Sequence, residues 1–203
     1  MNDATLRLIG RAHTSEQTIS AFETARRCGF NDINMDIIAG LPGEGEKEVA
    51  HTLEEIEKLG PDSLTVHSLA LKRSTRLNLN LDEYADISFD NSQRIMDLAE
   101  MSAMRMGMSP YYLYRQKNIA GNLENVGYAA SGCFGLYNVL IMEEKQTIMA
   151  AGSGSMSKFV YGNGRIERSP NVKDIDNYIN RTDEMIGRKK TALDEYLKYR
   201  SEI

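Results

Sequence analysis

The chain has 203 residues, of which 41% are hydrophobic and 26% charged, so it can bury a core and is neither disordered nor collagen-like. Its formal net charge of -5 argues against a protein that coats nucleic acid, because binding to phosphates needs a cationic surface. It has no apolar run near the roughly 20 residues of a membrane helix, and its N-terminus shows no secretory signal pattern.

The first third of the chain alternates between helix and strand patterns. A Thr14-x-x-Gln17 capping box precedes the first helix pattern, and Gly60-Pro61 ends the second. The glycines and proline of residues 40–43 predict a tight turn between strand and helix. In chain order, the predicted elements are helix 14–28, buried strand 33–38, helix 46–59 and strand 63–71. This order is typical of right-handed crossover units in a parallel sheet.

The pattern changes in the second half, where short strand candidates replace the alternation. The predicted elements are a polar loop over 72–89, a helix over 90–106 with an Asp90-x-x-Gln93 cap, strands at 111–115, 136–143, 147–151 and 158–161, and a charged helical segment over 172–203. Residues 143–145 (EEK) between two of these strands predict a hairpin.

The two crossover strands cannot form a complete fold by themselves. A parallel sheet needs both faces covered, and an α/β barrel needs about eight strands, or about six when other elements close it. We therefore expect either a partner that supplies strands or a longer protein whose N-terminal half precedes this chain, and we favour the second. The predicted fold class is α/β, with domains at 1–89 and 90–203.

Asp36 is the leading candidate for a functional residue. It lies inside the apolar run INMDIIAGLPG, near the carboxyl end of a predicted parallel strand, where α/β sheets place their ligands. A carboxylate there can accept hydrogen bonds from a ribose hydroxyl or an amino group. The alternative is a structural aspartate that caps backbone amides of the following turn.

Four further features have a functional and a structural interpretation. Arg11 can bind a carboxylate through both guanidinium nitrogens or be an ordinary surface residue, and His67 can be a ligand or a core histidine. Residues 111–118 (YYLYRQKN) form either a platform for a flat anionic ligand or a strand of alternating tyrosines. Residues 152–157 (GSGSMS) predict a flexible turn whose amides can approach a ligand.

The cysteines indicate the compartment. Cys28 and Cys133 are the only two, and their separation fits neither a disulfide framework nor a metal site. We therefore expect a reduced, cytoplasmic protein.

Together, several segments of the chain resemble a known family. They are IGRAHT, ARRCGFNDINMDIIAGLPGE, TVHSLALKRST, PYYLYRQKNIAGNLENVGYA, YNVLIMEEKQTIMAAGSGSMSK and NVKDIDNYINRTDEMI. As a set they resemble the C-terminal portion of coproporphyrinogen dehydrogenases of the HemZ type. These are radical S-adenosylmethionine (SAM) enzymes similar to oxygen-independent coproporphyrinogen III oxidase.

The resemblance implies a fold and a cofactor set. It implies the last strands of a partial (βα)6 radical SAM barrel, at 33–38 and 63–71, followed by a smaller α+β domain that covers the substrate. Members of the family bind a [4Fe-4S] cluster through a CxxxCxxC motif, which this sequence lacks. The resemblance therefore implies SAM as a cofactor, a cluster held only in the full-length parent, and an isolated chain without activity.

The resemblance also implies an activity and residues that serve it. The activity is the oxidative decarboxylation of coproporphyrinogen III propionates to vinyl groups, by a radical generated from SAM with electrons from an unidentified donor. Arg11 and Asp36 match positions that contact SAM, and Ala70 and Met156 fall where relatives place smaller SAM contacts. The porphyrinogen substrate is the implied partner, without nucleic acid or membrane.

Four propionates need cationic partners, for which we hypothesise a small set of residues. They are Arg115 and Lys117, with Lys72 and Arg73 as further candidates. Two rival interpretations stay open. One is a haem or porphyrin carrier without decarboxylase activity, with His13, His67 or the tyrosines of 111–114 as axial ligands. The other is a nonfunctional fragment whose open sheet edge promotes aggregation.

Overall fold

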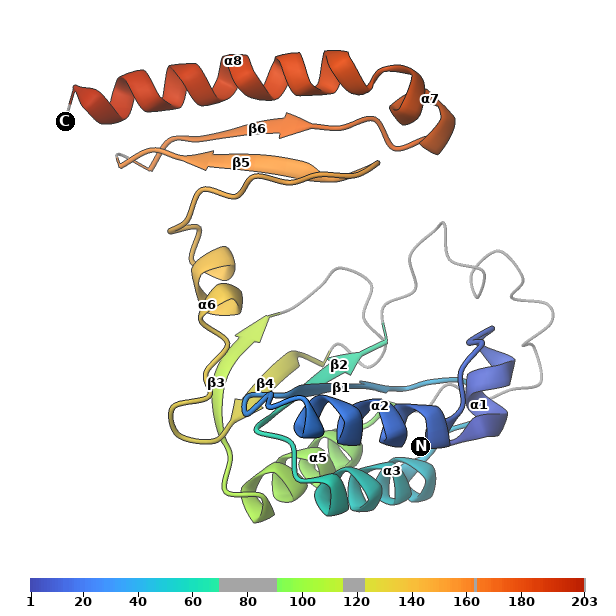
Figure 1. Ribbon diagram of the computed structural model, residues 1–203. Helices are drawn as coiled ribbons and strands as arrows, with labels where there is room; N and C mark the ends of the chain where they lie inside the picture. The colour runs from blue at the N-terminus through green and yellow to red at the C-terminus, as the bar shows by residue number, and fades with distance from the viewer. Residues whose placement is uncertain (70–90, 115–122, 163, 203) are drawn as a thin grey trace. The chain divides into compact units, whose positions relative to one another are not determined.

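The structure is a computed structural model that describes residues 1–69, 91–114, 123–162 and 164–202 (Figure 1). The chain divides into two compact units, Met1–Gly135 and Leu136–Ile203, which are described separately. The predicted loop at 72–89 lies outside the described residues. The predicted domain boundary at residue 90 separates the barrel strands and helices from the C-terminal domain. This boundary stays a prediction.

The first unit is a four-stranded mixed sheet with helices. Its elements are α1 (Asp3–Leu8), α2 (Ser15–Arg27), β1 (Asn34–Ala39), α3 (Glu46–Leu59), β2 (Ser63–Ser68), α5 (Gln93–Arg105), β3 (Ser109–Tyr114) and β4 (Asn125–Ala129). The strand order is β1-β2-β4-β3, with β1 and β2 parallel and the other two pairs antiparallel. The predicted helix–strand–helix–strand order and the parallel pairing are confirmed.

Local sequence signals fix the ends of the two predicted helices. The Thr14 hydroxyl accepts from the Gln17 amide at 3.2 Å, and the Gln17 side chain accepts from the Thr14 amide at 3.0 Å, so the predicted capping box is present. Gly60 ends α3 in the left-handed region with φ 62°, which a residue without a Cβ adopts at little cost.

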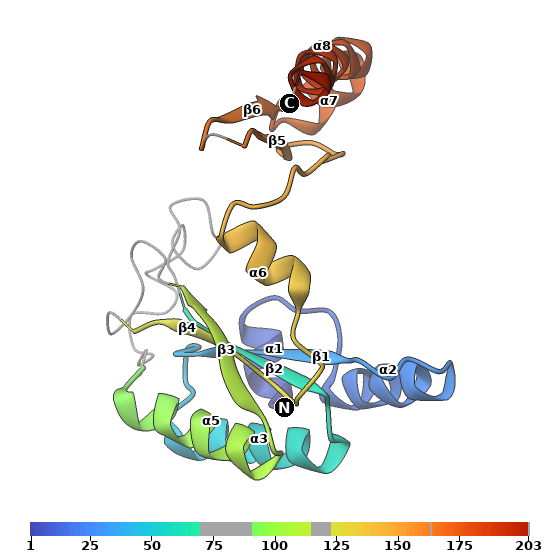
Figure 2. The same cartoon turned by 90° about the vertical axis from the view of Figure 1, so that its left-hand side faces the viewer.

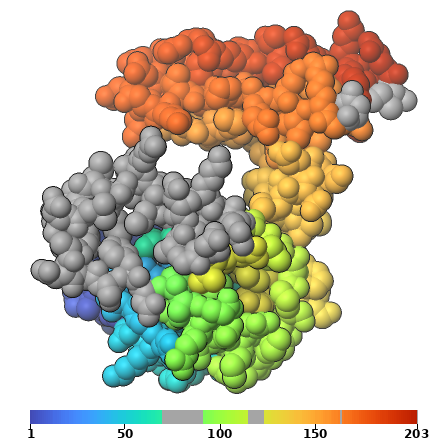
Figure 3. Space-filling model, turned by 180° about the vertical axis from the view of Figure 1, so that it is seen from behind, coloured from blue at the N-terminus to red at the C-terminus, as the bar shows by residue number. Residues whose placement is uncertain are grey.

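The core lies between the sheet and the pair α3 and α5, which lie on one face of the sheet (Figures 1 and 2). Alternate side chains of β1 and β2 point to that face, as the two-residue period of a strand requires. The core includes Ile37 and Ala39 of β1, Leu64 and Val66 of β2, Val49, Leu53 and Ile56 of α3, and Ile95, Met96, Ala99 and Ala103 of α5. Figure 3 shows the same region from behind, with the α3 and α5 segments side by side.

The second unit is a β-hairpin with a long helix against it. Its elements are α6 (Leu136–Met142), β5 (Met156–Val160), β6 (Ile166–Pro170), α7 (Ile175–Asn180) and α8 (Thr182–Ser201). The strands β5 and β6 pair antiparallel. Phe159 and Tyr161 are buried on the side that packs against α8, where both contact the ring of Tyr196 at centroid distances of 5.8 and 5.4 Å.

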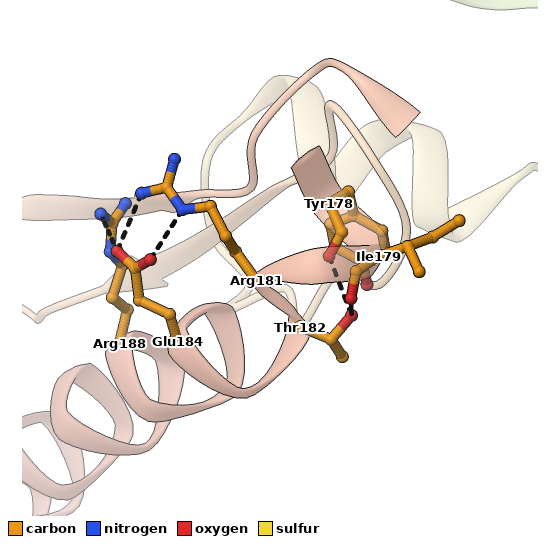
Figure 4. A network of polar contacts seen from close by, with 6 residues as sticks. All are labelled: Tyr178, Ile179, Arg181, Thr182, Glu184 and Arg188. Atoms are coloured by element: carbon orange, nitrogen blue, oxygen red, sulfur yellow. Dashed lines mark hydrogen bonds and ion pairs between the residues drawn. The ribbon is translucent and has the colours of Figure 1, made fainter. Parts of the chain in front are cut away.

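The junction of α7 and α8 is held by two sets of polar contacts (Figure 4). The Thr182 hydroxyl donates to the carbonyl oxygens of Tyr178 and Ile179, at 2.9 and 3.0 Å. Glu184 accepts from Arg181 at 2.8 and 3.0 Å and also pairs with Arg188. The predicted helical segment 172–203 therefore contains two helices, α7 and α8, which are joined at Arg181.

The strand predicted at 136–143 is wrong, because these residues form the helix α6. The run contains Leu and Met, which favour helix, and it pairs with no strand among the residues that the structure describes. Residues 143–145 close this helix instead of forming a hairpin: the Glu143 amide donates to Val139 and the Lys145 amide to Leu140. The strand predicted at 147–151 is reduced to one bridge, between Ile148 and Lys158.

Other differences concern the caps and the shorter elements. The N-cap of α5 is Ser92, whose hydroxyl accepts from the Ile95 amide, and not Asp90. The elements α1, β4 and β6 were not predicted, because each is short and carries a weak periodic signal. No helix within the described ranges is both long and apolar enough to span a membrane.

Candidate functional site

The sheet of the first unit has a polar face opposite α3 and α5. Asp36 of β1 is in register with Thr65 of β2, which pairs with Gly127 of β4, which in turn pairs with Tyr112 of β3. Residues in register share a face, so this row crosses the whole sheet. We call the following set the polar face: Asn34, Asp36, Thr65, His67, Gly127, Tyr112 and Tyr114.

Asp36 is held by neighbours on the same face. The Asn34 amide donates to Asp36 Oδ1 at 2.6 Å, and the Thr65 hydroxyl donates to Asn34 Oδ1 at 3.1 Å. His67 Nε2 lies 3.9 Å from Asp36 Oδ1. Hydrogen bonding from His67, with a further contribution from Asn34, lowers the pKa of Asp36 below its usual value, although partial burial opposes this. The carboxylate is 60% exposed and therefore accessible to a ligand.

Two tyrosines of β3 complete the polar face. The Tyr114 hydroxyl lies 3.3 Å from His67 Nδ1. The Tyr112 ring covers Gly127 so closely that a Cβ there would lie 2.0 Å from a ring carbon. A glycine in a strand often marks such a close approach. The rings of Tyr112 and Tyr114 are nearly parallel, with an interplanar angle of 6° and centroids 6.2 Å apart. Burial raises the pKa of Tyr112.

A pocket of about 510 Å³ lies next to the polar face, beside the edge strand β1. Its lining combines charged and imidazole side chains from several elements with an apolar floor. The polar lining includes Arg11, His13, Asp36, Glu44 and His67. The volume is within the usual range of about 300–1,000 Å³ for small-molecule sites.

The structure brings together two of the predicted SAM contacts. Arg11, in the segment after α1, and Asp36, in β1, line the same pocket. Met156 lies in the second unit, at the start of β5, and is 49% exposed. Ala70, Arg115 and Lys117 lie outside the described residues, as do Lys72 and Arg73. The assigned roles of all these residues stay predictions.

The sequence did not single out the polar network around Asp36. His67 is half-buried on the polar face, where it contacts Asp36 and Tyr114. Asn34 and Asp36 are exposed, although the run INMDII was predicted to be a buried strand. The sequence did carry a signal for this face, because residues two apart in a strand share a face. In β1, the polar residues Asn34 and Asp36 alternate with core residues.

Comparisons with known proteins identify the relatives of this chain. The family model of the radical SAM superfamily matches residues 1–56. The HemZ protein of Bacillus subtilis, described as oxygen-independent coproporphyrinogen-III oxidase-like, is 46% identical over 200 residues, which cover 98% of this chain and 38% of that protein. The resemblance to a HemZ-type radical SAM protein is confirmed.

A second relative and a solved structure agree with this family. The heme chaperone HemW of Bacillus subtilis is 27% identical over 118 residues, covering 58% of this chain and 31% of that protein. The structure of coproporphyrinogen III oxidase (HemN) from Escherichia coli, a radical SAM enzyme, matches with a TM-score of 0.62 and 19% identity, covering 91% of this chain and 41% of that one. The predicted fold class, part of a radical SAM barrel followed by a smaller α+β region, is therefore confirmed.

The relatives are much longer than this chain, which spans 38% of HemZ and 41% of the HemN structure. Radical SAM proteins use SAM and a [4Fe-4S] cluster, and the residues present fit the two groups differently. The pocket beside Asp36 offers a carboxylate and a guanidinium, which suit SAM. A cluster does not fit: the chain has two cysteines, Cys28 and Cys133, and the described residues contain no group of three potential metal ligands.

Proposed function

We propose that this chain supplies the SAM-binding edge and the substrate-covering region of a radical SAM oxidoreductase. The proposed reaction is the oxidative decarboxylation of coproporphyrinogen III propionates to vinyl groups. The observation that carries the proposal is that Arg11 and Asp36 line one pocket. Support also comes from the 46% identity to the HemZ protein over 98% of the chain.

The pocket residues complement the functional groups of SAM. Asp36, whose Oδ1 is already bonded to Asn34, is accessible to ribose hydroxyls as a hydrogen-bond acceptor. Arg11 offers a planar donor pair for a carboxylate. When bound, SAM supplies the oxidising chemistry of the family, and the residues of this chain bind it, orient it and exclude water.

The polar face next to the pocket suits a flat macrocycle. Tyr112 and Tyr114 present nearly parallel rings on the same face as Asp36, and aromatic side chains pack well against planar ligands. Arg115 and Lys117 follow β3 directly in the sequence, and we propose that they pair with the propionates. In this proposal, the [4Fe-4S] cluster and the electron donor are not supplied by this chain. We also propose that the protein acts in the cytoplasm.

Calorimetric titration of the 203-residue chain with SAM tests the cofactor role. Asp36→Asn and Arg11→Met should each weaken binding about tenfold, because a hydrogen bond to a charged group is worth about 1.5–3 kcal/mol. Glu54→Gln, at an exposed position of α3, is the matched control and should bind SAM as the unmodified chain does. The proposal is wrong if the chain binds no SAM at millimolar concentration, or if Asp36→Asn has no effect.

A haem or porphyrin carrier is the second candidate. The contact of His67 with Tyr114, two residue types that ligate haem iron, favours it, as does the similarity to the heme chaperone HemW. Titration with haemin should then give a Soret band that is lost in the double variant His67→Ala, Tyr114→Phe. An unchanged band in that variant would exclude these two ligands.

A further inference from the structure

We propose that His67 is a positioning residue that connects Tyr114 to Asp36 across the polar face. Its neutral ring carries the proton on Nε2, accepts the Tyr114 hydroxyl at Nδ1, and directs Nε2–H to the Asp36 carboxylate. Its effect on bound SAM rests on the function proposed above. The arrangement of the three side chains itself does not, and it can be tested without a ligand.

The chemistry of the Asp36 carboxylate, together with two distances, indicates the direction of this chain of contacts. The Tyr114 hydroxyl is 3.3 Å from Nδ1, and Nε2 is 3.9 Å from Asp36 Oδ1. A neutral imidazole has one donor and one acceptor nitrogen. Since a carboxylate only accepts, the nitrogen nearer to Asp36 is the one that carries the proton. The hydroxyl of Tyr114 then donates to the remaining nitrogen.

The strand geometry holds the three side chains near each other. Asp36 is in register with Thr65, so His67 is its diagonal neighbour on the adjacent strand, a separation that long side chains bridge. Asn125, which is 1% exposed, ties the other contact in place. Its side chain accepts from the Ser68 amide at 2.8 Å and donates to the Tyr114 carbonyl at 3.2 Å. The backbones on either side of the His67–Tyr114 contact are therefore fixed to each other.

The surrounding charges agree with a donor at Nε2. Hydrogen bonding from His67 is the largest cause of the lowered pKa of Asp36. The other ionisable groups that line the shared pocket are the amino group of Met1, Arg11 and His13 from the segment before α2, and Glu44 after β1. Asn34 donates to Oδ1 and His67 Nε2 lies 3.9 Å from the same oxygen, so both neighbours restrict the carboxylate and reduce the cost of ordering it around a ligand.

The first experiment measures the tautomer in the ligand-free chain. Long-range ¹H–¹⁵N correlation spectra report which ring nitrogen is protonated, and the chain has three histidines, so His13→Gln and His51→Gln assign the signals. We expect His67 to be the Nε2–H tautomer at neutral pH. We also expect Tyr114→Phe and Asp36→Asn each to mix the tautomers. A dominant Nδ1–H tautomer, or unchanged tautomer populations in both variants, overturns the proposal.

The second experiment measures SAM affinity in two variants, each of which replaces one of the two ring nitrogens of His67 with an amide nitrogen. The Gln amide nitrogen takes the place of Nε2, whereas the Asn amide reaches only the place of Nδ1. We expect His67→Gln to bind within about twofold of the unmodified chain and His67→Asn about fivefold more weakly, as for one lost hydrogen bond. His51→Gln, at an exposed position of α3, is the control.

The outcomes of the two experiments separate the proposals. Equal affinities for His67→Gln and His67→Asn would show that His67 does not position Asp36 through Nε2. If the unmodified chain binds no SAM, the proposed function fails, and the tautomer experiment still decides whether His67 connects Tyr114 to Asp36.

Discussion

Gly127 is the position at which one added methyl group should most disturb the polar face. It lies in β4, which pairs with β2 on one side and β3 on the other, so its backbone has little freedom to shift. A Cβ at this position would lie 2.0, 2.5 and 2.8 Å from three carbons of the Tyr112 ring. Cβ atoms in real proteins essentially never lie within 3.0 Å of a neighbouring heavy atom, so in Gly127→Ala the ring must move.

The expected cost follows from what the ring loses when it moves. Overpacking typically costs about 1–3 kcal/mol. The loss of glycine flexibility in the unfolded chain offsets about 0.4–1 kcal/mol. We therefore expect Gly127→Ala to lower the free energy of unfolding by about 1–2 kcal/mol.

Urea unfolding followed by circular dichroism measures this change as a shift of the midpoint at constant slope. The matched background is Tyr112→Ala, in which the ring is absent. There, Gly127→Ala should be neutral or stabilising, so the two substitutions should show a coupling energy of about 1–2 kcal/mol. Additive effects, or an unaltered midpoint in Gly127→Ala alone, would refute the argument that the ring occupies this space.

Three further predictions concern the stability of separate parts of the chain. Ser92→Ala removes the N-cap of α5 and should cost about 1 kcal/mol in urea unfolding, while Ser92→Asp should retain the stability. The Arg105 guanidinium lowers the pKa of Glu57. The stability that this ion pair contributes to the folded state is therefore present above the usual glutamate pKa and is lost as pH falls through the lower folded pKa. The loss of unfolding free energy between about pH 6 and 3 should be smaller in Glu57→Gln, and an equal loss would contradict this. Asn171 is 6% exposed and forms hydrogen bonds with Gly152, Ser155 and Lys189. Asn171→Ala should therefore lower the free energy of unfolding by about 1–3 kcal/mol and speed amide hydrogen exchange over 152–155. Unchanged exchange would show that Asn171 does not hold this turn.

The chain's local signals were sufficient for two helices of the first unit, α2 and α3. The Thr14 capping box and Gly60 depend on contacts within a few residues, so the sequence predicted the ends of α2 and α3 closely. The same is true of β1 and β2, whose parallel pairing follows from the helix between them. The resemblance to the family likewise rests on short segments of consecutive residues, which the sequence shows directly.

The strands that pair over long sequence distances depended on the tertiary structure. β4 lies between β2 and β3 in the sheet although it follows both in sequence, and no local pattern specifies such an insertion. The run at 136–143, which was predicted to be a strand, contains residues that favour strand and residues that favour helix, and it forms helix α6. Propensity cannot decide between them, because strand formation needs a partner that only the fold provides.

The candidate site shows the same division. Asp36 and Arg11 were identified in the sequence as separate candidates, from residue type, position in a strand and family resemblance. Their presence in one pocket, and the contacts of His67 with Asp36 and Tyr114, come only from the fold. Sequence alone determines which chemical groups are available and the local elements that carry them. Tertiary structure decides which groups meet, because the register of the strands places side chains from distant positions on one face.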